Sequence, residues 1–247
     1  MEELSKDELT FNEPFLCAYK FVLLADFKKA TDQVKCALEN NATNKLKEIK
    51  FCTECFKNAA NEIRNKIRQI HEISDFEING SDGDQQAWSL CLKKYREDLE
   101  ELCESGIKLF QQLIGKTEAN SGKIIYQFTI ADLLRYKCES ICREKYMLSA
   151  LSAYEGAYEA AKNLSGEDMT RIRGGLNYAL FLAEVQKNKD KALEITEEVR
   201  SAANSALESE KGTAKLGEGA LTDIHETLQF MEENENFWRK CNDNYWK

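Results

Sequence analysis

An arginine and a tyrosine stand side by side in the stretch DLLRYKCES (132–140), which carries the clearest chemistry of the sequence. On a helix, Asp132 lies one turn before Arg135 and Glu139 one turn after it, so both carboxylates are within reach of the guanidinium. A guanidinium that a carboxylate holds at one edge still offers donors to a phosphate at the other edge. Because Tyr136 adds a hydroxyl donor, this pair is suited to binding an oxyanion.

Two further cations occur in the stretch FKNAANEIR (56–64). Lys57 and Arg64 are two helical turns apart, so they project from one face, about 10 Å apart along the axis. Two like charges on one face repel, which leaves two interpretations: a solvated basic face or a site for an anion. If this face converges with Arg135 and Tyr136, four donors surround a dianionic phosphate. A phosphoserine, with a charge of about −1.5 to −2 near neutral pH, fits that description.

The elements that must position these residues are helices. The chain has one proline and 12 glycines among 247 residues, and its apolar residues recur at helical spacing without any strand-like alternation. The spacing predicts long helices at about 44–74 and 85–114, and short loops that make successive helices antiparallel neighbours. The predicted loops are ENNAT (39–43), FEINGSDGD (76–84), GKTEANSG (115–122), LSGED (164–168), QKNKD (186–190) and SEKGTAKLGEG (209–219). We therefore expect an all-α fold of antiparallel helical hairpins in a single domain.

The composition excludes several classes of function. A formal net charge of -9 argues against binding to nucleic acid or to an anionic membrane. The charged start MEELSKDELTF is unlike a signal peptide, and no apolar run is long enough to span a bilayer. Nine cysteines are then expected to be reduced thiols of a cytoplasmic protein.

Five stretches in order resemble the 14-3-3 family between about residues 44 and 240. They are FKNAANEIR, the RY pair at 135–136, GGLNYALFLAEV (174–185), KDKALEITEEV (189–199) and LQFMEENENFW (228–238). The resemblance implies about nine helices that form a cup, usually as a dimer, and a groove that binds phosphorylated Ser/Thr segments of client proteins. It implies an adaptor without catalytic residues, metal or cofactor.

The resemblance also assigns residues by position. The phosphate would be held by Lys57, Arg64, Arg135 and Tyr136. The client peptide would be held by Asn177, Leu180, Glu184, Phe230, Asn234 and Trp238. A primary amide can pair with a peptide group as donor and acceptor, so the two asparagines suit the client backbone. In this scheme residues 1–43 form the dimerisation region, 44–240 the groove helices and 241–247 a short tail.

The sequence departs from the family at the groove and at the dimerisation region. Phe128 stands where the family usually has a lysine, and Glu226 stands where it has a groove leucine. We therefore expect a tolerance of basic or aromatic client residues near the phosphosite. ADFKKA (25–30) inverts the usual charge order, which favours a rebuilt or weakened homodimer over mixed dimers. Tyr245 and Trp246 could dock or fray.

Two alternatives from other classes stay open. The chain could be a helical scaffold that binds unphosphorylated peptides. It could also be a redox sensor built on Cys52 and Cys55, which a low thiol pKa would support. The CxxC lies inside a helical pattern without a second ligand pair, so a zinc site is not expected. No glycine-rich phosphate loop or nucleophile elbow is present, so we do not expect an enzyme.

Overall fold

The computed structural model describes residues 13–40, 43, 45–76, 82–209, 216–242 and 244–246. Within these ranges every regular element is a helix, which confirms the all-α prediction. The chain divides into two compact units, residues 1–129 and 130–247, and the division falls inside helix α5 (Asn120–Ser140). The single-domain organisation stays a prediction. The described helices contain no segment that is both long and apolar enough to cross a membrane.

The first helices that the structure describes in the first unit are two short ones. They are α1 (Glu13–Leu23) and α2 (Phe27–Asn40). A turn separates them because Ala25 has a left-handed φ of 54° and the Asp26 amide donates to the Phe21 carbonyl at 2.9 Å. The Asp26 carboxylate then accepts from the Lys29 amide and caps α2. Left-handed backbone at an alanine has no sequence signal, so the sequence does not predict this turn.

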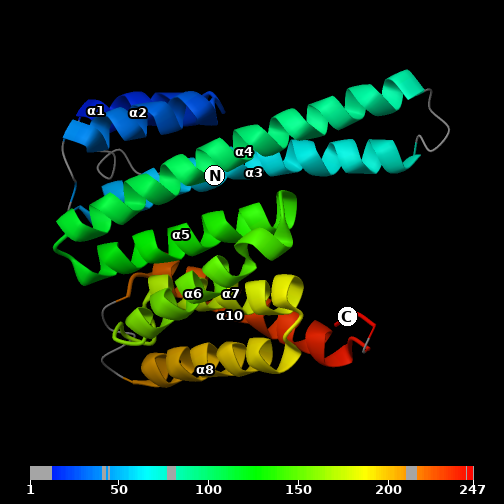
Figure 1. Ribbon diagram of the computed structural model, residues 1–247. Coiled ribbons are helices and arrows are strands. Elements are labelled where there is room, and N and C mark those ends of the chain that lie inside the picture. The colour runs from blue at the N-terminus through cyan, green and yellow to red at the C-terminus, as the bar shows by residue number, and fades with distance from the viewer. Residues whose placement is uncertain are drawn as a thin grey trace. The chain divides into compact units, whose positions relative to one another are not determined.

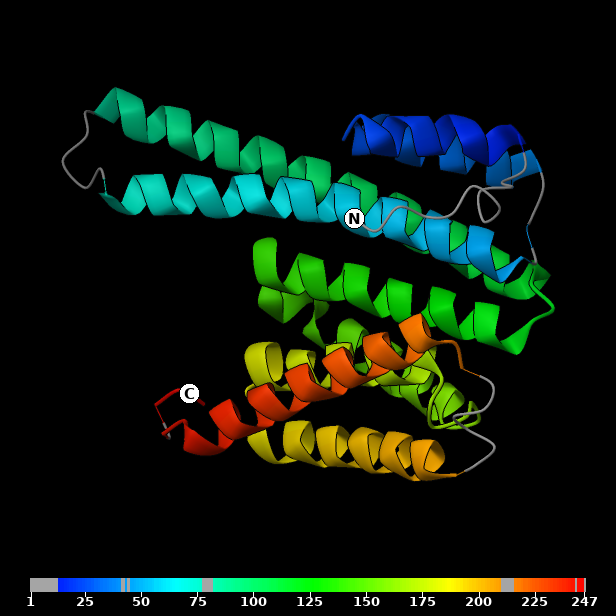
Figure 2. The ribbon, with the colours of Figure 1, turned by 180° about the vertical axis from the view of Figure 1, so that it is seen from behind.

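Two long helices follow, α3 (Leu46–Phe76) and α4 (Asp82–Lys116), close to the bounds that the sequence predicts. They lie side by side in both views (Figures 1 and 2). Phe56 on α3 meets Phe110 on α4 at a centroid distance of 5.1 Å, and Phe110 stacks on Tyr126 of α5 at 5.3 Å. All three rings are fully buried. This aromatic chain is the centre of the first unit's core.

The predicted loop at 115–122 is shorter than expected because α4 continues through Gly115 and α5 begins at Asn120. Gly122 is a packing glycine of α5. A Cβ at this position would stand 2.7 Å from Cδ1 of Ile49 on α3, which is closer than any side chain tolerates. Gly122, which the sequence analysis placed in a loop, therefore lies at a close contact between α5 and α3.

The second unit contains the end of α5, α6 (Arg143–Ala161), α7 (Met169–Leu180), α8 (Lys189–Glu208) and α10 (Glu218–Lys240). α7 packs on α8, and α10 packs on both. Side-chain caps begin two of these helices, since Asp168 accepts from the Thr170 amide and Asn188 accepts from the Lys191 amide. Both caps fall in loops that the sequence predicts.

A π-helical turn, Phe181–Gln186 (η2), continues α7 and ends in a left-handed Lys187 with φ 62°. The amide of Asn188 reaches back to the Leu182 carbonyl at 2.8 Å, which closes the helix end in the manner of a Schellman motif. π-turns recur at functional sites, and this one carries Glu184.

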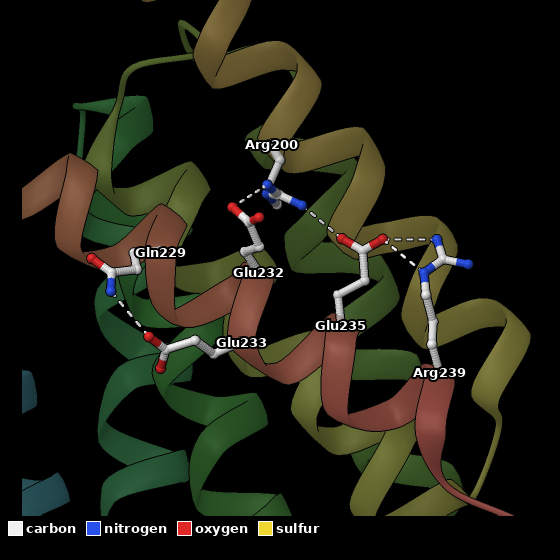
Figure 3. A network of polar contacts seen from close by, with 6 residues as sticks. All are labelled: Arg200, Gln229, Glu232, Glu233, Glu235 and Arg239. Atoms are coloured by element: carbon white, nitrogen blue, oxygen red, sulfur yellow. Dashed lines mark hydrogen bonds and ion pairs between the residues drawn. The ribbon is translucent and has the colours of Figure 1, made fainter.

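Ion pairs join α10 to α8 within the second unit (Figure 3). Arg200 of α8 donates to Glu235 and to Glu232 of α10, both at 2.7 Å. Arg239 binds the other oxygen of Glu235 from one turn further along α10. Burial alone would raise the pKa of Glu235, but the hydrogen bonds from Arg239 and Arg200 outweigh it, and its pKa lies below the ordinary value.

Candidate functional site

Arg135 is held on two sides within the second unit. Its Nη1 donates to Glu139 Oε1 at 2.9 Å, as the i to i+4 spacing predicts. Its Nε donates to the hydroxyl of Tyr154 on α6 at 3.1 Å. The guanidinium also lies 5.0 Å from the ring centroid of Tyr136. With 13% of its side chain exposed, Arg135 is a restrained cation. A guanidinium has five N–H donors, so these two hydrogen bonds do not exhaust it.

Arg135 stays protonated although its side chain is largely buried. Burial would lower the pKa of this guanidinium, but the electrostatic influence of Tyr154, Glu139 and Asp132 is larger, and the pKa is raised well above its ordinary value. A group that stays cationic and oriented at all physiological pH values has the properties that binding of a phosphate dianion requires.

The Asp132 carboxylate is linked to Arg135 through a third side chain, which the sequence spacing does not predict. The Tyr154 hydroxyl, which accepts from Arg135, donates to Asp132 Oδ1 at 2.6 Å. Asp132 is 1% exposed, and both of its oxygens also accept from Nδ2 of Asn177 on α7, each at 3.1 Å. The structure therefore brings three elements of the second unit together at one buried carboxylate. Tyr154 is the residue that the sequence missed, because a contact across 22 positions leaves no local pattern.

Lys57 and Arg64 lie on α3, which belongs to the first unit. Each has an acceptor one turn before it on the same helix: Glu54 lies 3.1 Å from Lys57 Nζ, and Asn61 accepts from Arg64 Nη1 at 2.7 Å. Both side chains are half-buried. Because α3 and the Arg135 segment belong to different units, the convergence of these four residues stays a prediction.

The predicted peptide-binding residues of α10 differ in exposure. Phe230 is 47% exposed, whereas Trp238 is 1% exposed and belongs to the core of the second unit. Asn234 is half-buried, and its Nδ2 is buried without a hydrogen bond to any residue that the structure describes. The stripe at Ile224, Leu228 and Met231 is core packing, as its spacing indicates. Glu226, the departure noted in the sequence, is exposed.

On α7, Leu180 is half-buried, one turn after Asn177. A close contact sets the position of this helix: a Cβ at Gly175 would stand 2.4 Å from Cγ2 of Val199 on α8. Phe128, the departure from lysine on α5, is only 6% exposed and belongs to the first unit. Its burial explains the apolar replacement, because a lysine there would need a partner.

Tyr245, in the described part of the C-terminal tail, packs on the second unit. Tyr245 packs edge-on against Phe237 at 5.6 Å and on Trp246 at 4.9 Å. Lys187 Nζ lies 4.4 Å from the Tyr245 ring centroid, a cation–π distance. Burial, and after it the Glu184 carboxylate, raises the pKa of the Tyr245 hydroxyl. Of the two outcomes left open by the sequence, docking is the one observed.

Cys52 and Cys55 lack the properties of a reactive thiol pair. Cys52 and Cys55 are buried in α3, and burial raises the pKa of Cys55 to about 12 and that of Cys52 well above its ordinary value. A redox sensor needs the opposite shift. Among the described residues, no group of three metal-ligating side chains comes together.

Comparisons with known proteins agree with this geometry. The family model described as 14-3-3 protein matches residues 24–239. A 14-3-3 protein of Giardia intestinalis is 28% identical over 150 residues, which cover 59% of this chain and 58% of that protein. Thus the match spans less than two thirds of that relative. The 14-3-3 protein 5 of Solanum lycopersicum is 26% identical, covering 78% of this chain and 76% of that protein. The 14-3-3-like protein 2 of Caenorhabditis elegans is 24% identical, covering 87% and 84%.

Proposed function

Because the chain belongs to the 14-3-3 family, we propose that it is a phosphoserine/phosphothreonine-dependent adaptor that binds phosphorylated segments of client proteins. Family membership supports phosphopeptide binding in general and an adaptor rather than an enzyme. The observation that carries the specific proposal is Arg135, a cation held by Glu139 and Tyr154 with donors to spare. Its proposed compartment is the cytoplasm, where reduced cysteines are ordinary.

In the proposed site, Lys57, Arg64, Arg135 and Tyr136 converge on the phosphate. Charge-assisted hydrogen bonds contribute about 1.5–3 kcal/mol each before ordering costs are subtracted. Since Arg135 is already oriented in the free protein, it loses little side-chain entropy when the phosphate binds. That preorganisation makes a short phosphorylated segment a sufficient ligand.

The proposed peptide path uses Asn177 and Asn234 for the client backbone. Asn234 supports this role because its buried Nδ2 makes no hydrogen bond within the described part of the chain, and an unpaired buried donor is costly. Phe230, which is half exposed, and Leu180 supply an apolar wall. Glu184 supports the peptide from the π-turn. Trp238 would act from within the core, by supporting α10.

The proposed assembly is a homodimer formed through the first unit. Leu23 and Leu24 protrude at the α1–α2 turn with 63% and 74% of their surface exposed. The same unit contains a cavity of about 480 Å³ between α2, α3 and α4, lined in part by Lys66, Tyr95 and Asp98. Ala25, which follows Leu24 in the chain, also lines this cavity. Protruding leucines next to a cavity allow a two-fold contact in which a leucine of each copy enters the cavity of the other. Burying a leucine contributes about 1.5–3 kcal/mol.

Sedimentation velocity tests the dimer. We expect Leu24→Asp to shift the wild-type dimer toward the monomer. The matched control is Leu90→Asp, which adds the same charge at a leucine that is 68% exposed on α4. It should leave the monomer–dimer equilibrium unchanged. A monomeric wild type would contradict the proposal. Stable mixed dimers with an ordinary family member would contradict the exclusive pairing that the inverted charge order at 25–30 favours.

Fluorescence anisotropy tests the adaptor function with a phosphoserine peptide and its unphosphorylated twin. We expect binding that requires the phosphate and is lost in Lys57→Glu. Lys93→Glu, at a lysine that is 73% exposed on α4, changes the net charge equally and should bind like the wild type. Equal binding of both peptides would instead favour the alternative, a helical scaffold indifferent to phosphorylation.

A further inference from the structure

A continuous chain of hydrogen bonds links two residues with different predicted roles. Arg135 Nε donates to the Tyr154 hydroxyl, Tyr154 donates to Asp132, and Asn177 donates to the same carboxylate. The four side chains come from α5, α6 and α7, all within the second unit. Arg135 is the predicted phosphate ligand and Asn177 a predicted backbone ligand. Tyr154 and Asp132 are fully buried, so neither can contact a client directly.

The hydroxyl of Tyr154 has only one proton, and its neighbours decide where that proton points. Arg135 Nε can only donate, so the hydroxyl oxygen accepts there and its hydrogen is directed to Asp132. The 2.6 Å distance to Asp132 is typical of a charge-assisted bond to a carboxylate. Burial raises the pKa of Tyr154 well above its ordinary value, so this proton stays in place. The hydroxyl is therefore a fixed link rather than a free rotor.

The carboxylate also fixes the amide of Asn177. An ionised carboxylate only accepts, so the amide nitrogen must face Asp132, and both Asp132 oxygens lie 3.1 Å from it. This removes the usual ambiguity between the oxygen and the nitrogen of an asparagine side chain. The Asn177 Oδ1 is consequently turned away from Asp132 and offers an acceptor. The fitting partner is a backbone N–H of an extended peptide.

We propose that Tyr154 and Asp132 are positioning residues that couple the phosphate-binding Arg135 to Asn177, so that the amide which binds the client backbone is held with its Oδ1 as the acceptor. This inference rests on the proposed function for its client half. Its other half is a property of the free protein. Removing the hydroxyl of Tyr154 should make the side chains of both Arg135 and Asn177 more mobile, although no hydrogen bond in the chain joins these two residues directly.

The experiment compares Tyr154→Phe, which removes only the hydroxyl, with Tyr178→Phe. Tyr178 is also buried, and its ring stacks on that of Tyr154 at 5.6 Å, so it controls for loss of a buried hydroxyl nearby. Hydrogen exchange of the Arg135 Nε–H and the Asn177 side-chain amide is followed by NMR without any ligand. We expect at least about tenfold faster exchange at both sites in Tyr154→Phe and no change in Tyr178→Phe. Unchanged exchange at Asn177 would overturn the coupling.

The client half uses a phosphoserine peptide and versions N-methylated at one backbone amide at a time. Wild type should lose about tenfold in affinity for the version whose methyl replaces the N–H that Asn177 accepts. This loss of affinity on methylation should disappear in Asn177→Ala. It should be smaller in Asp132→Asn, because the Asn177 side-chain amide is no longer oriented by a carboxylate. A penalty that is the same in all three proteins would overturn the acceptor role. Failure of the wild type to prefer the phosphorylated peptide would refute the proposed function instead, and the exchange rates would still decide the coupling.

Discussion

Gly175 lies where α7 meets α8, two residues before Asn177, and it offers a quantitative test of the packing that positions this helix. A Cβ built at Gly175 stands 2.4 Å from Val199 Cγ2 and 3.4 Å from Tyr158 Cε2. Val199 is 1% exposed and its branched side chain has little rotamer freedom, so α7 itself must shift. Overpacking of this kind costs about 1–3 kcal/mol. At about 2–4 °C per kcal/mol for a chain of this size, Gly175→Ala should lower Tm by roughly 2–12 °C.

Thermal unfolding followed by circular dichroism measures this shift, and two further variants isolate its cause. Gly156→Ala is the matched control, because a Cβ there meets nothing within 4 Å and α6 should become slightly more stable. Combining Gly175→Ala with Val199→Ala removes the clashing methyl groups, so the double variant should be more stable than the two separate losses predict. A Gly175→Ala protein as stable as the wild type, or strictly additive losses, would refute the reasoning.

Three other predictions follow from burial and charge. Cys52 and Cys55 should react with iodoacetamide only after unfolding, since burial raises both pKa values. Peptide mapping separates them from the exposed Cys17, Cys36 and Cys91, and rapid labelling of Cys52 or Cys55 in the native protein at pH 8 would contradict this. The pKa of Glu235 is lower in the folded protein than in the unfolded chain, where it is about 4.3. Ionised Glu235 therefore stabilises the fold at pH values above about 4.3, and this stabilisation is lost as the pH falls through the pKa of the folded state. The Tm advantage of wild type over Glu235→Gln should therefore shrink below pH 4, and a constant advantage would disprove the linkage. Acrylamide should quench Trp246 more strongly in Lys187→Ala than in wild type, as the tail loses its cation–π contact; equal quenching would mean that this contact does not hold the tail.

The helices could be predicted because their signals are local. One proline, few glycines and a 3.6-residue apolar period place α3 and α4 within about three residues of their observed ends. The pairing of Arg135 with Glu139 has the same origin, since residues four apart on a helix are neighbours. Where the prediction was wrong, tertiary packing outweighed the local signal. Gly122 was interpreted as a loop glycine, but it lies in α5 and packs closely against Ile49.

The candidate site was only half accessible from the sequence. Residue types predict Arg135 as a candidate, and the resemblance to the family predicts Asn177, but neither predicts the buried Asp132–Tyr154 pair that joins them. Hydrogen bonds between separate helices leave no periodic pattern in the sequence. Likewise Trp238 resembles a groove residue by position, yet it is 1% exposed. Exposure depends on which helices cover a side chain, and a single sequence does not contain that information.

The measurement that tests the central claim most directly is the ratio of affinities for a phosphoserine peptide and its unphosphorylated twin, in wild type and Arg135→Gln. One charge-assisted hydrogen bond to the phosphate, at about 1.5–3 kcal/mol, corresponds to a ratio of roughly 10 to 150. We expect the wild type to reach at least this ratio and Arg135→Gln, which keeps a polar side chain but lacks the charge and the fork, to lose most of it. Equal affinity of wild type for the two peptides would contradict the account.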